Sequence, residues 1–169
     1  MKSIRTKITA IVLSLVAGAV LPSCSPVAHT SVSSRSQLLA SDSATAFNAK
    51  DYLKAQTLAA EATNADPQFA EAWVGYGMAS VRLGQRDQAR QAYEQALALH
   101  QARHRQNPSD ANQPVQQIFL LTLLGRPTEA EMMLKQARID YPNDQTISKL
   151  AENFAATRQE WASIAVEAK

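Results

Sequence analysis

The chain has 169 residues, enough for one domain, and its five glycines and few aromatic residues, beside many alanines, glutamines and leucines, favour helix over sheet. The formal net charge is +2 and becomes −1 if the basic N-terminal segment is removed, so charge gives no argument for a nucleic-acid surface. A single cysteine excludes an internal disulfide framework.

The N-terminus has the pattern of a secretory signal peptide. Lys2, Arg5 and Lys7 give it a basic start with no acidic residue, and residues 8–21 form an apolar run. This run is shorter than the roughly 20 apolar residues that a transmembrane helix needs. A basic head, a short apolar run and small residues after it predict a signal peptide over residues 1–23.

The residues that follow resemble the lipobox of bacterial lipoproteins. In Leu21-Pro22-Ser23-Cys24, leucine lies three positions before the cysteine and a small residue lies just before it. The resemblance implies cleavage before Cys24 and a covalent lipid on that residue, and no other cofactor is expected. Two or more acyl chains anchor a protein stably, because each buried methylene contributes about 0.8 kcal/mol. Ser25, in place of aspartate, implies the outer membrane, with the protein facing the periplasm.

Residues 24–36 are predicted to form a flexible tether, because they are polar, serine-rich and have no helical face. About a dozen residues span at most roughly 40 Å when extended, so the domain would stay close to the membrane.

Two alternatives to a lipid anchor on Cys24 remain open, namely ordinary signal-peptide cleavage beside an unmodified cysteine and a retained N-terminal anchor helix.

The next residues predict repeated pairs of amphipathic helices. In the first repeat, residues 36–69, helices are expected at about 37–49 and 52–64, and Pro67 ends the second one. The second repeat, residues 70–103, predicts two amphipathic helices joined by a turn at 83–85, and the apolar residues after the turn are spaced by three and four.

The second repeat also predicts a close helix pair and a long second helix. Gly77 and Ala89 are small enough to let the two helices approach, with Tyr93 among the residues between them. Good helix formers continue over residues 100–106 as far as Asn107-Pro108. The second helix is therefore expected to extend about two turns beyond the usual length.

The third repeat, residues 111–144, is broken at Gly125-Arg126-Pro127. Pro127 suits a first helical position, and Thr128 with Glu131 resembles a capping box.

A partial repeat is predicted over residues 145–169. Asn143-Asp144 should cap its helix, and a short break is expected near Arg158-Gln159. This segment is expected to cover the last apolar face of the array.

The second repeat resembles the tetratricopeptide repeat (TPR), with six signature positions in the order and spacing of that motif: Trp73, Gly77, Gly84, Ala89, Tyr93 and Ala96. The resemblance implies an all-α superhelical solenoid of antiparallel helix pairs over residues 37–169, with about seven or eight helices. TPR proteins bind other proteins, so a protein partner is expected rather than a small-molecule substrate or a nucleic acid.

The same resemblance implies that the first helix of each pair lines a concave groove. The expected partner-binding positions are Ser41, Asn48, Val74, Met78, Arg82, Gln116 and Phe119. The Lys/Asn/Arg set with which some TPR proteins clamp a C-terminal carboxylate is missing. Met78 and Phe119 could instead pack between repeats, and this alternative stays open.

Other candidates for chemistry have simpler interpretations. His100 and His104 lie four residues apart on one helix face, as a metal site would need, but Arg103 and Arg105 flank them and no third ligand is placed with them. A solvated helix end without metal is the preferred interpretation. The sequence contains no phosphate loop, nucleophile motif or catalytic carboxylate pair, so an enzyme is not expected.

Signal peptide, lipobox and three repeats, including LLGRPTEAE in the third, together resemble the TPR lipoproteins of pilus assembly, such as the TadD-type lipoproteins of tight-adherence (Flp) pili. This resemblance implies a membrane-anchored scaffold that binds a component of a pilus or secretion apparatus in the periplasm. The alternatives are a structural subunit of an outer-membrane assembly complex and an accessory factor of cell-wall remodelling.

Overall fold

The computed structural model describes residues 33–161 and residue 165. The predicted signal peptide, Cys24 and nearly all of the predicted tether lie outside the described residues. All regular elements within the described part are helices: α1 (Ser34–Asn48), α2 (Tyr52–Ala65), α3 (Ala70–Arg82), α4 (Arg86–Gln106), α5 (Asn112–Leu123), α6 (Pro127–Asp140) and α7 (Gln145–Trp161). The prediction of an all-α fold is confirmed. None of these helices has both the length and the apolar character needed to cross a membrane.

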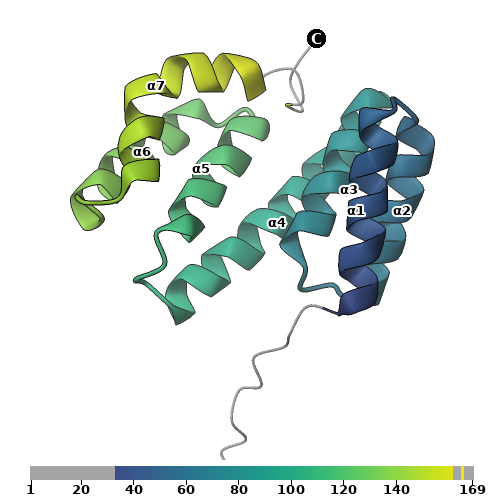
Figure 1. Cartoon of the computed structure of the whole chain (residues 1–169). Helices are drawn as coiled ribbons and strands as arrows, with labels where there is room; N and C mark the ends of the chain where they lie inside the picture. Colours follow the sequence, from purple (N-terminus) through teal and green to yellow (C-terminus); the bar gives the residue numbers. More distant parts are fainter. Residues whose placement is uncertain (1–32, 162–164, 166–169) are drawn as a thin grey trace, which may run out of the picture. The chain divides into compact units, whose positions relative to one another are not determined.

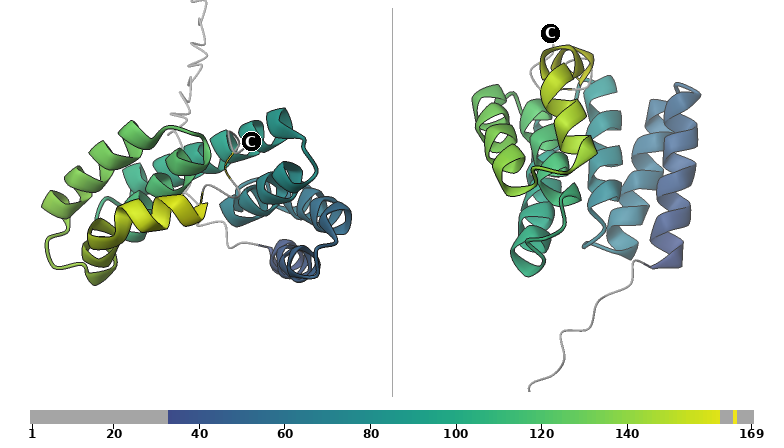
Figure 2. Two further views of the ribbon diagram at one scale, coloured as in Figure 1. Left: turned by 90° about the horizontal axis from the view of Figure 1, so that it is seen from above. Right: turned by 60° about the vertical axis from the view of Figure 1, so that its left-hand side comes forward.

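The helices pack in chain order, each against the next, as Figure 1 and Figure 2 show. Helix α1 also contacts α3, and α5 also contacts α7. Helices α3 and α5, both fully described, differ from this pattern, since no Cα atom of one lies within 8 Å of a Cα atom of the other. The long helix α4, which ends at Gln106 as predicted, is therefore the element that connects the first two pairs to α5.

Three inter-helix turns share the same backbone conformation. Gly84 and Gly125, with φ of 75° and 71°, follow α3 and α5, and Lys50, with φ of 63°, follows α1. In each turn the residue with positive φ donates its N–H to a carbonyl three residues back, and the next residue donates to one five residues back. These bonds satisfy carbonyls at the helix end, and glycine adopts the conformation with little strain.

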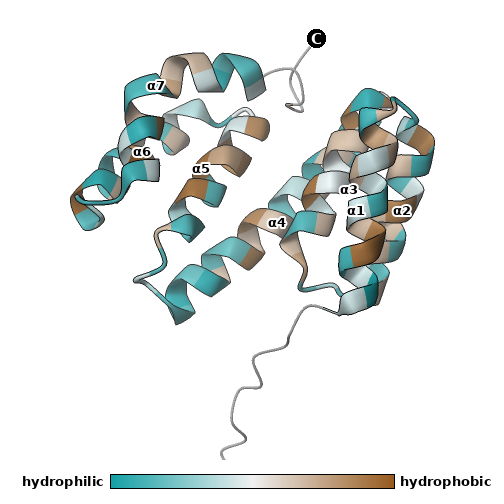
Figure 3. Ribbon diagram, in the orientation of Figure 1, coloured by the Kyte–Doolittle hydropathy of each residue, from teal (hydrophilic) through white to brown (hydrophobic). Residues whose placement is uncertain are grey.

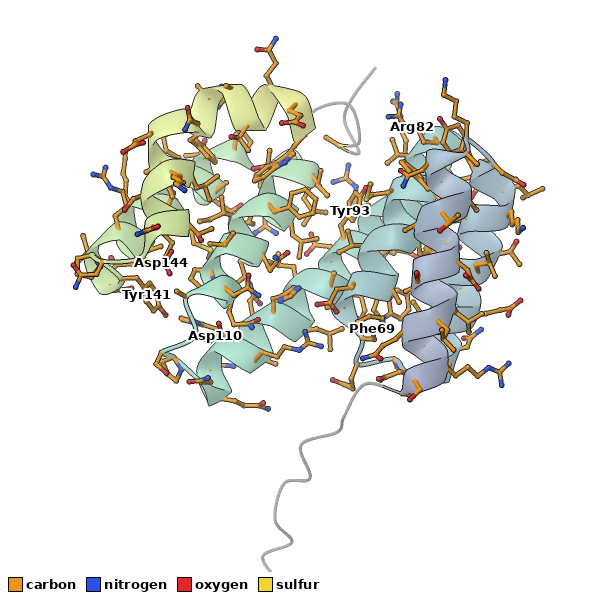
Figure 4. The ribbon with its side chains drawn as sticks, viewed as in Figure 1. Phe69, Arg82, Tyr93, Asp110, Tyr141 and Asp144 are labelled. Carbon is orange, nitrogen blue, oxygen red and sulfur yellow. The ribbon has the colours of Figure 1, made fainter. Side chains whose placement is uncertain are left out.

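Close approach of α3 and α4 depends on Gly77. A Cβ atom at this position would lie 2.7 Å from Cδ1 of Tyr93 and closer still to Cε1. Tyr93, labelled in Figure 4, has no exposed surface. Small residues in α2, α4 and α6 are also completely buried: Ala55, Ala59, Ala62, Ala89, Ala96 and Ala130. Figure 3 shows the resulting alternation of hydrophobic and hydrophilic residues along the ribbons.

The start of α7 agrees with the sequence prediction, and the start of α6 agrees with it only in part. The side chain of Asp144 accepts a hydrogen bond from the backbone N–H of Ile147 at 2.9 Å, which confirms the predicted cap of α7. Pro127 is the first residue of α6, also as predicted, but the predicted capping box is wrong. The residue before α6 is Arg126, which makes no side-chain cap and instead binds the carboxylate of Glu129 at 2.5 and 2.6 Å.

Helix α7 has no break near residues 158 and 159, which corrects the second prediction for this region. The segment contains neither proline nor glycine, so nothing in its backbone prevents a continuous helix as far as Trp161. The indole ring of Trp161 meets the ring of Phe119 on α5 edge-on, with 4.8 Å between ring centroids. This contact holds the end of α7 against α5.

Candidate functional site

A pocket of about 290 Å³ lies between α1 and α3, with one residue of α2 in its wall. We call it the α1–α3 pocket. It is lined by Ala40, Ser43, Ala44, Phe47, Asn48, Ala59, Glu71, Ala72, Val74, Gly75 and Met78. Most of these side chains are small or apolar, so the pocket offers a mainly apolar surface.

Hydrogen bonding fixes one wall of the α1–α3 pocket. Ser43 is buried, and its hydroxyl donates to the carbonyl oxygen of Ala55 on α2 at 2.8 Å. Gly75 faces this wall from α3, since a Cβ atom there would lie 3.7 Å from Oγ of Ser43 and 3.9 Å from Cβ of Ala59. These are ordinary van der Waals distances, so Gly75 leaves room for a methyl group and widens the pocket by that amount.

The polar groups of the α1–α3 pocket lie in α1 and at the start of α3. Asn48 is exposed, and its side-chain amide forms no hydrogen bond with another described residue. Glu71 lies 3.8 Å from a guanidinium nitrogen of Arg103 on α4, and its side chain is 57% exposed. The pocket therefore presents one amide that can both donate and accept and one weakly paired carboxylate.

The structure brings together three of the residues predicted to bind a partner. Asn48, Val74 and Met78 all line the α1–α3 pocket. Arg82, labelled in Figure 4, does not line it, and its guanidinium carbon lies 6.0 Å from the ring centroids of both Phe47 and Tyr52. Arg82 thus packs against the aromatic pair next to the pocket, in a cation–π arrangement.

The other predicted partner-binding residues lie apart from the pocket. Ser41 is exposed on α1 and is not a lining residue. Gln116 and Phe119 belong to α5, which has no Cα atom within 8 Å of a Cα atom of α3, and Phe119 packs against Trp161. The structure therefore separates the seven predicted residues into positions on α1–α3 and positions on α5, rather than placing them along one pocket.

Sequence reasoning missed several pocket residues, notably Ala40, Ser43 and Ala72. Ala40, Ala44 and Phe47 are spaced by four and three along α1, which is the signal for one helix face. A stripe of small residues differs little in hydrophobicity from its neighbours, and it also occurs where two helices simply pack together. The spacing alone therefore does not distinguish a pocket from a helix contact.

His100 is not at a solvated helix end, which corrects the sequence interpretation. It is 2% exposed, and its Nδ1 lies 2.9 Å from Oε1 of Gln113, whose Nε2 donates to the carboxylate of Asp110 at 2.7 Å. Burial, the largest cause, lowers the pKa of His100 by disfavouring the charged ring, against the raising effect of the Gln113 hydrogen bond. Within the described residues no cluster of three or more His, Cys, Asp or Glu side chains could hold a metal ion.

Comparison with known proteins supports the interpretation of the fold. Residues 46–107, from the end of α1 through α4, match the tetratricopeptide repeat family. No curated protein matches the chain.

Solved structures with a similar fold include the type III secretion translocator chaperone SycD of Yersinia enterocolitica. In its alternative-dimer form it is 19% identical, with 76% of this chain and 92% of that chain covered at a TM-score of 0.50. A second SycD structure is 18% identical over 74% and 88% of the two chains, with a TM-score of 0.49. A chain of the CopN–Scc3 complex is 22% identical over 75% and 71%, also at 0.49. The matched repeats and the successive antiparallel helices show that the chain folds as a helical solenoid of the TPR type.

Proposed function

We propose that the protein is a protein-binding scaffold whose α1–α3 pocket takes an apolar segment of its partner. The pocket, with its small side chains, carries this proposal. Gly75, Ala44 and Ala72 leave space for an inserted side chain, and Met78 is a flexible thioether that adapts to different shapes. Asn48 can pair with a backbone N–H or C=O of the partner. A short helix or an extended segment with one apolar anchor fits these features.

We further propose that Cys24 carries a lipid that anchors the scaffold to the outer membrane, with its partner in the periplasm. The lipobox-like residues before Cys24 and the basic, apolar segment preceding them support this proposal. A component of a pilus or secretion apparatus is the proposed partner, on the resemblance to TPR lipoproteins of pilus assembly. Replacing Cys24 with alanine should move the protein from the membrane fraction to the soluble periplasmic fraction, and unchanged membrane association would contradict lipid anchoring.

Site-specific photo-crosslinking tests the pocket. A photoreactive residue at Met78 in the full-length protein, expressed in its native host, should capture a discrete partner. Combining it with Ala44→Glu should abolish that capture, because Ala44 is exposed at the pocket and a carboxylate there would meet an apolar ligand. Glutamate is a good helix former, so the substitution should not disturb α1.

Thr57→Glu is the matched control. Thr57 is exposed on α2 and does not line the pocket. Glutamate at this position adds the same negative charge as glutamate at position 44. Capture from Met78 should persist in this variant. Equal loss of capture in both variants would show that added charge, rather than occupation of the pocket, governs binding. Persistence of capture in Ala44→Glu would place the partner elsewhere.

A further inference from the structure

A second pocket, of about 400 Å³, lies among α2, α3 and α4 and shares no lining residue with the α1–α3 pocket. We call it the α2–α4 pocket. Its side chains combine two aromatic rings with a row of amides: Trp73, Tyr76, Asn64, Gln88, Gln91 and Gln95. The remaining lining residues are Thr63 and two alanines, so no charged side chain lines it.

The amides of the α2–α4 pocket are largely available to a ligand. The side chains of Asn64, Gln91 and Gln95 are exposed and form no hydrogen bond with any other described residue. Each offers two N–H donors and one carbonyl acceptor. Gln88, Gln91 and Gln95 lie on one face of α4, and with a rise of 1.5 Å per residue they form a row about 10 Å long.

Hydrogen bonds hold the two rings in place by their polar edges. Trp73 donates its indole N–H to the carbonyl oxygen of Pro67 at 3.0 Å, and the Tyr76 hydroxyl donates to Oε1 of Gln88 at 3.0 Å. Gln56 supports Gln88 by donating to the same oxygen at 3.2 Å. Because both polar edges are already bonded, the rings contribute mainly apolar surface to the pocket.

We propose that the α2–α4 pocket binds a neutral saccharide of about two linked sugar rings. Sugar hydroxyl groups both donate and accept, which matches side-chain amides, and the C–H face of a pyranose ring is apolar, which matches Trp73 and Tyr76. A charged ligand would lose hydration here without gaining an opposite charge from the lining. This pairing of aromatic surface with neutral, two-way hydrogen-bonding groups favours a saccharide over an ionic peptide.

Nuclear magnetic resonance on the full chain tests this proposal with chitotriose, cellotriose and maltotriose as probes. The chain contains two tryptophans, Trp73 and Trp161, so their indole N–H signals can be assigned with a Trp161→Phe variant. A fitting saccharide should shift the Trp73 signal in a saturable way and leave the Trp161 signal in place, because Trp161 packs on Phe119 away from this pocket.

The double variant Gln91→Ala and Gln95→Ala should weaken saccharide binding about tenfold, as expected for the loss of two modest hydrogen bonds. Gln101→Ala, exposed on the same helix outside the pocket, is the matched control and should bind as the unmodified chain does. No shift of the Trp73 signal by any of the three probes at tens of millimolar would overturn the proposal. A saccharide response that survives the double variant, or a saturable response only to a neutral peptide, would overturn it as well.

Discussion

The imidazole of His100 on α4 and the side-chain amide of Gln113 on α5 form a buried contact, with 2.9 Å between Nδ1 and Oε1. Because Nε2 of Gln113 donates to Asp110, Oε1 faces the ring and accepts from a protonated Nδ1 of His100. The contact lies where the extended part of α4 meets α5. It makes the junction between the second and third repeats sensitive to protonation.

Stability should therefore decrease on acidification. The folded-state pKa of His100 is below its ordinary value of 6.5, chiefly because burial disfavours the charged ring. The unfolded chain then binds more protons below about pH 6.5, and the free energy of unfolding falls as the pH decreases through this value toward the folded-state pKa. Urea unfolding at several pH values measures this slope. His100→Gln should reduce the slope, and an unchanged slope in this variant would contradict the assignment.

Gly77→Ala should destabilise the protein by about 1–3 kcal/mol, because its Cβ atom would overlap the ring of buried Tyr93. Gly75→Ala is the matched comparison in the same helix, with open space for the methyl group. It should be neutral or stabilise α3 by about 0.5–1 kcal/mol through reduced backbone entropy. Chemical denaturation of both variants compares the two. Equal effects would show that α3 and α4 are not in close contact at Gly77.

Lys50→Gly should stabilise the protein by about 1 kcal/mol, because Lys50 holds a φ of 63°, which is unfavourable for a residue with a Cβ atom. Gly84 has a φ of 75°, and an added Cβ atom there would have no other atom within 4 Å. Gly84→Ala should therefore destabilise the protein by a similar amount through backbone strain alone. Thermal unfolding should show melting temperatures that move in opposite directions. Movement in the same direction would contradict the shared turn geometry.

Ser43→Ala should lower the free energy of unfolding by about 0.5–1.5 kcal/mol, because it removes the buried hydrogen bond to Ala55 between α1 and α2. Ser41→Ala, two residues away and exposed, should change stability by less than about 0.5 kcal/mol. Denaturant unfolding distinguishes the two. A loss equal to that of Ser41→Ala would mean that the Ser43 bond adds nothing to the α1–α2 contact.

Local signals in the sequence accounted for much of the fold. Gly84, Pro127 and Asp144 each mark a helix boundary through their own backbone or side-chain chemistry, and all three lie where the structure uses them. Lys50 was not recognised, because the left-handed conformation that glycine usually adopts is here occupied by a lysine.

The features that sequence reasoning missed depend on packing between distant residues. His100 is buried because α5 covers the extension of α4, and no local pattern specifies that contact. The spacing of α3 and α5, which have no Cα atoms within 8 Å of each other, has a similar origin, because it depends on how α4 packs against both helices. The periodicity of one helix fixes which face is buried, but not how far apart two nonadjacent helices lie.

The lack of close approach between α3 and α5 makes the energetics of the fold nearly one-dimensional. Among the described helices no Cα atom of α1 lies within 8 Å of a Cα atom of α5, α6 or α7, so a change in α1 is expected to reach α7 through successive helix interfaces. Double-mutant cycles that pair Ser43 with Trp161 should accordingly give coupling free energies near zero, whereas cycles across Gly77 and Tyr93 should give large ones. Ligand occupancy in the α1–α3 pocket would stabilise the first repeats and leave the local opening of α7, measured by hydrogen exchange, almost unchanged.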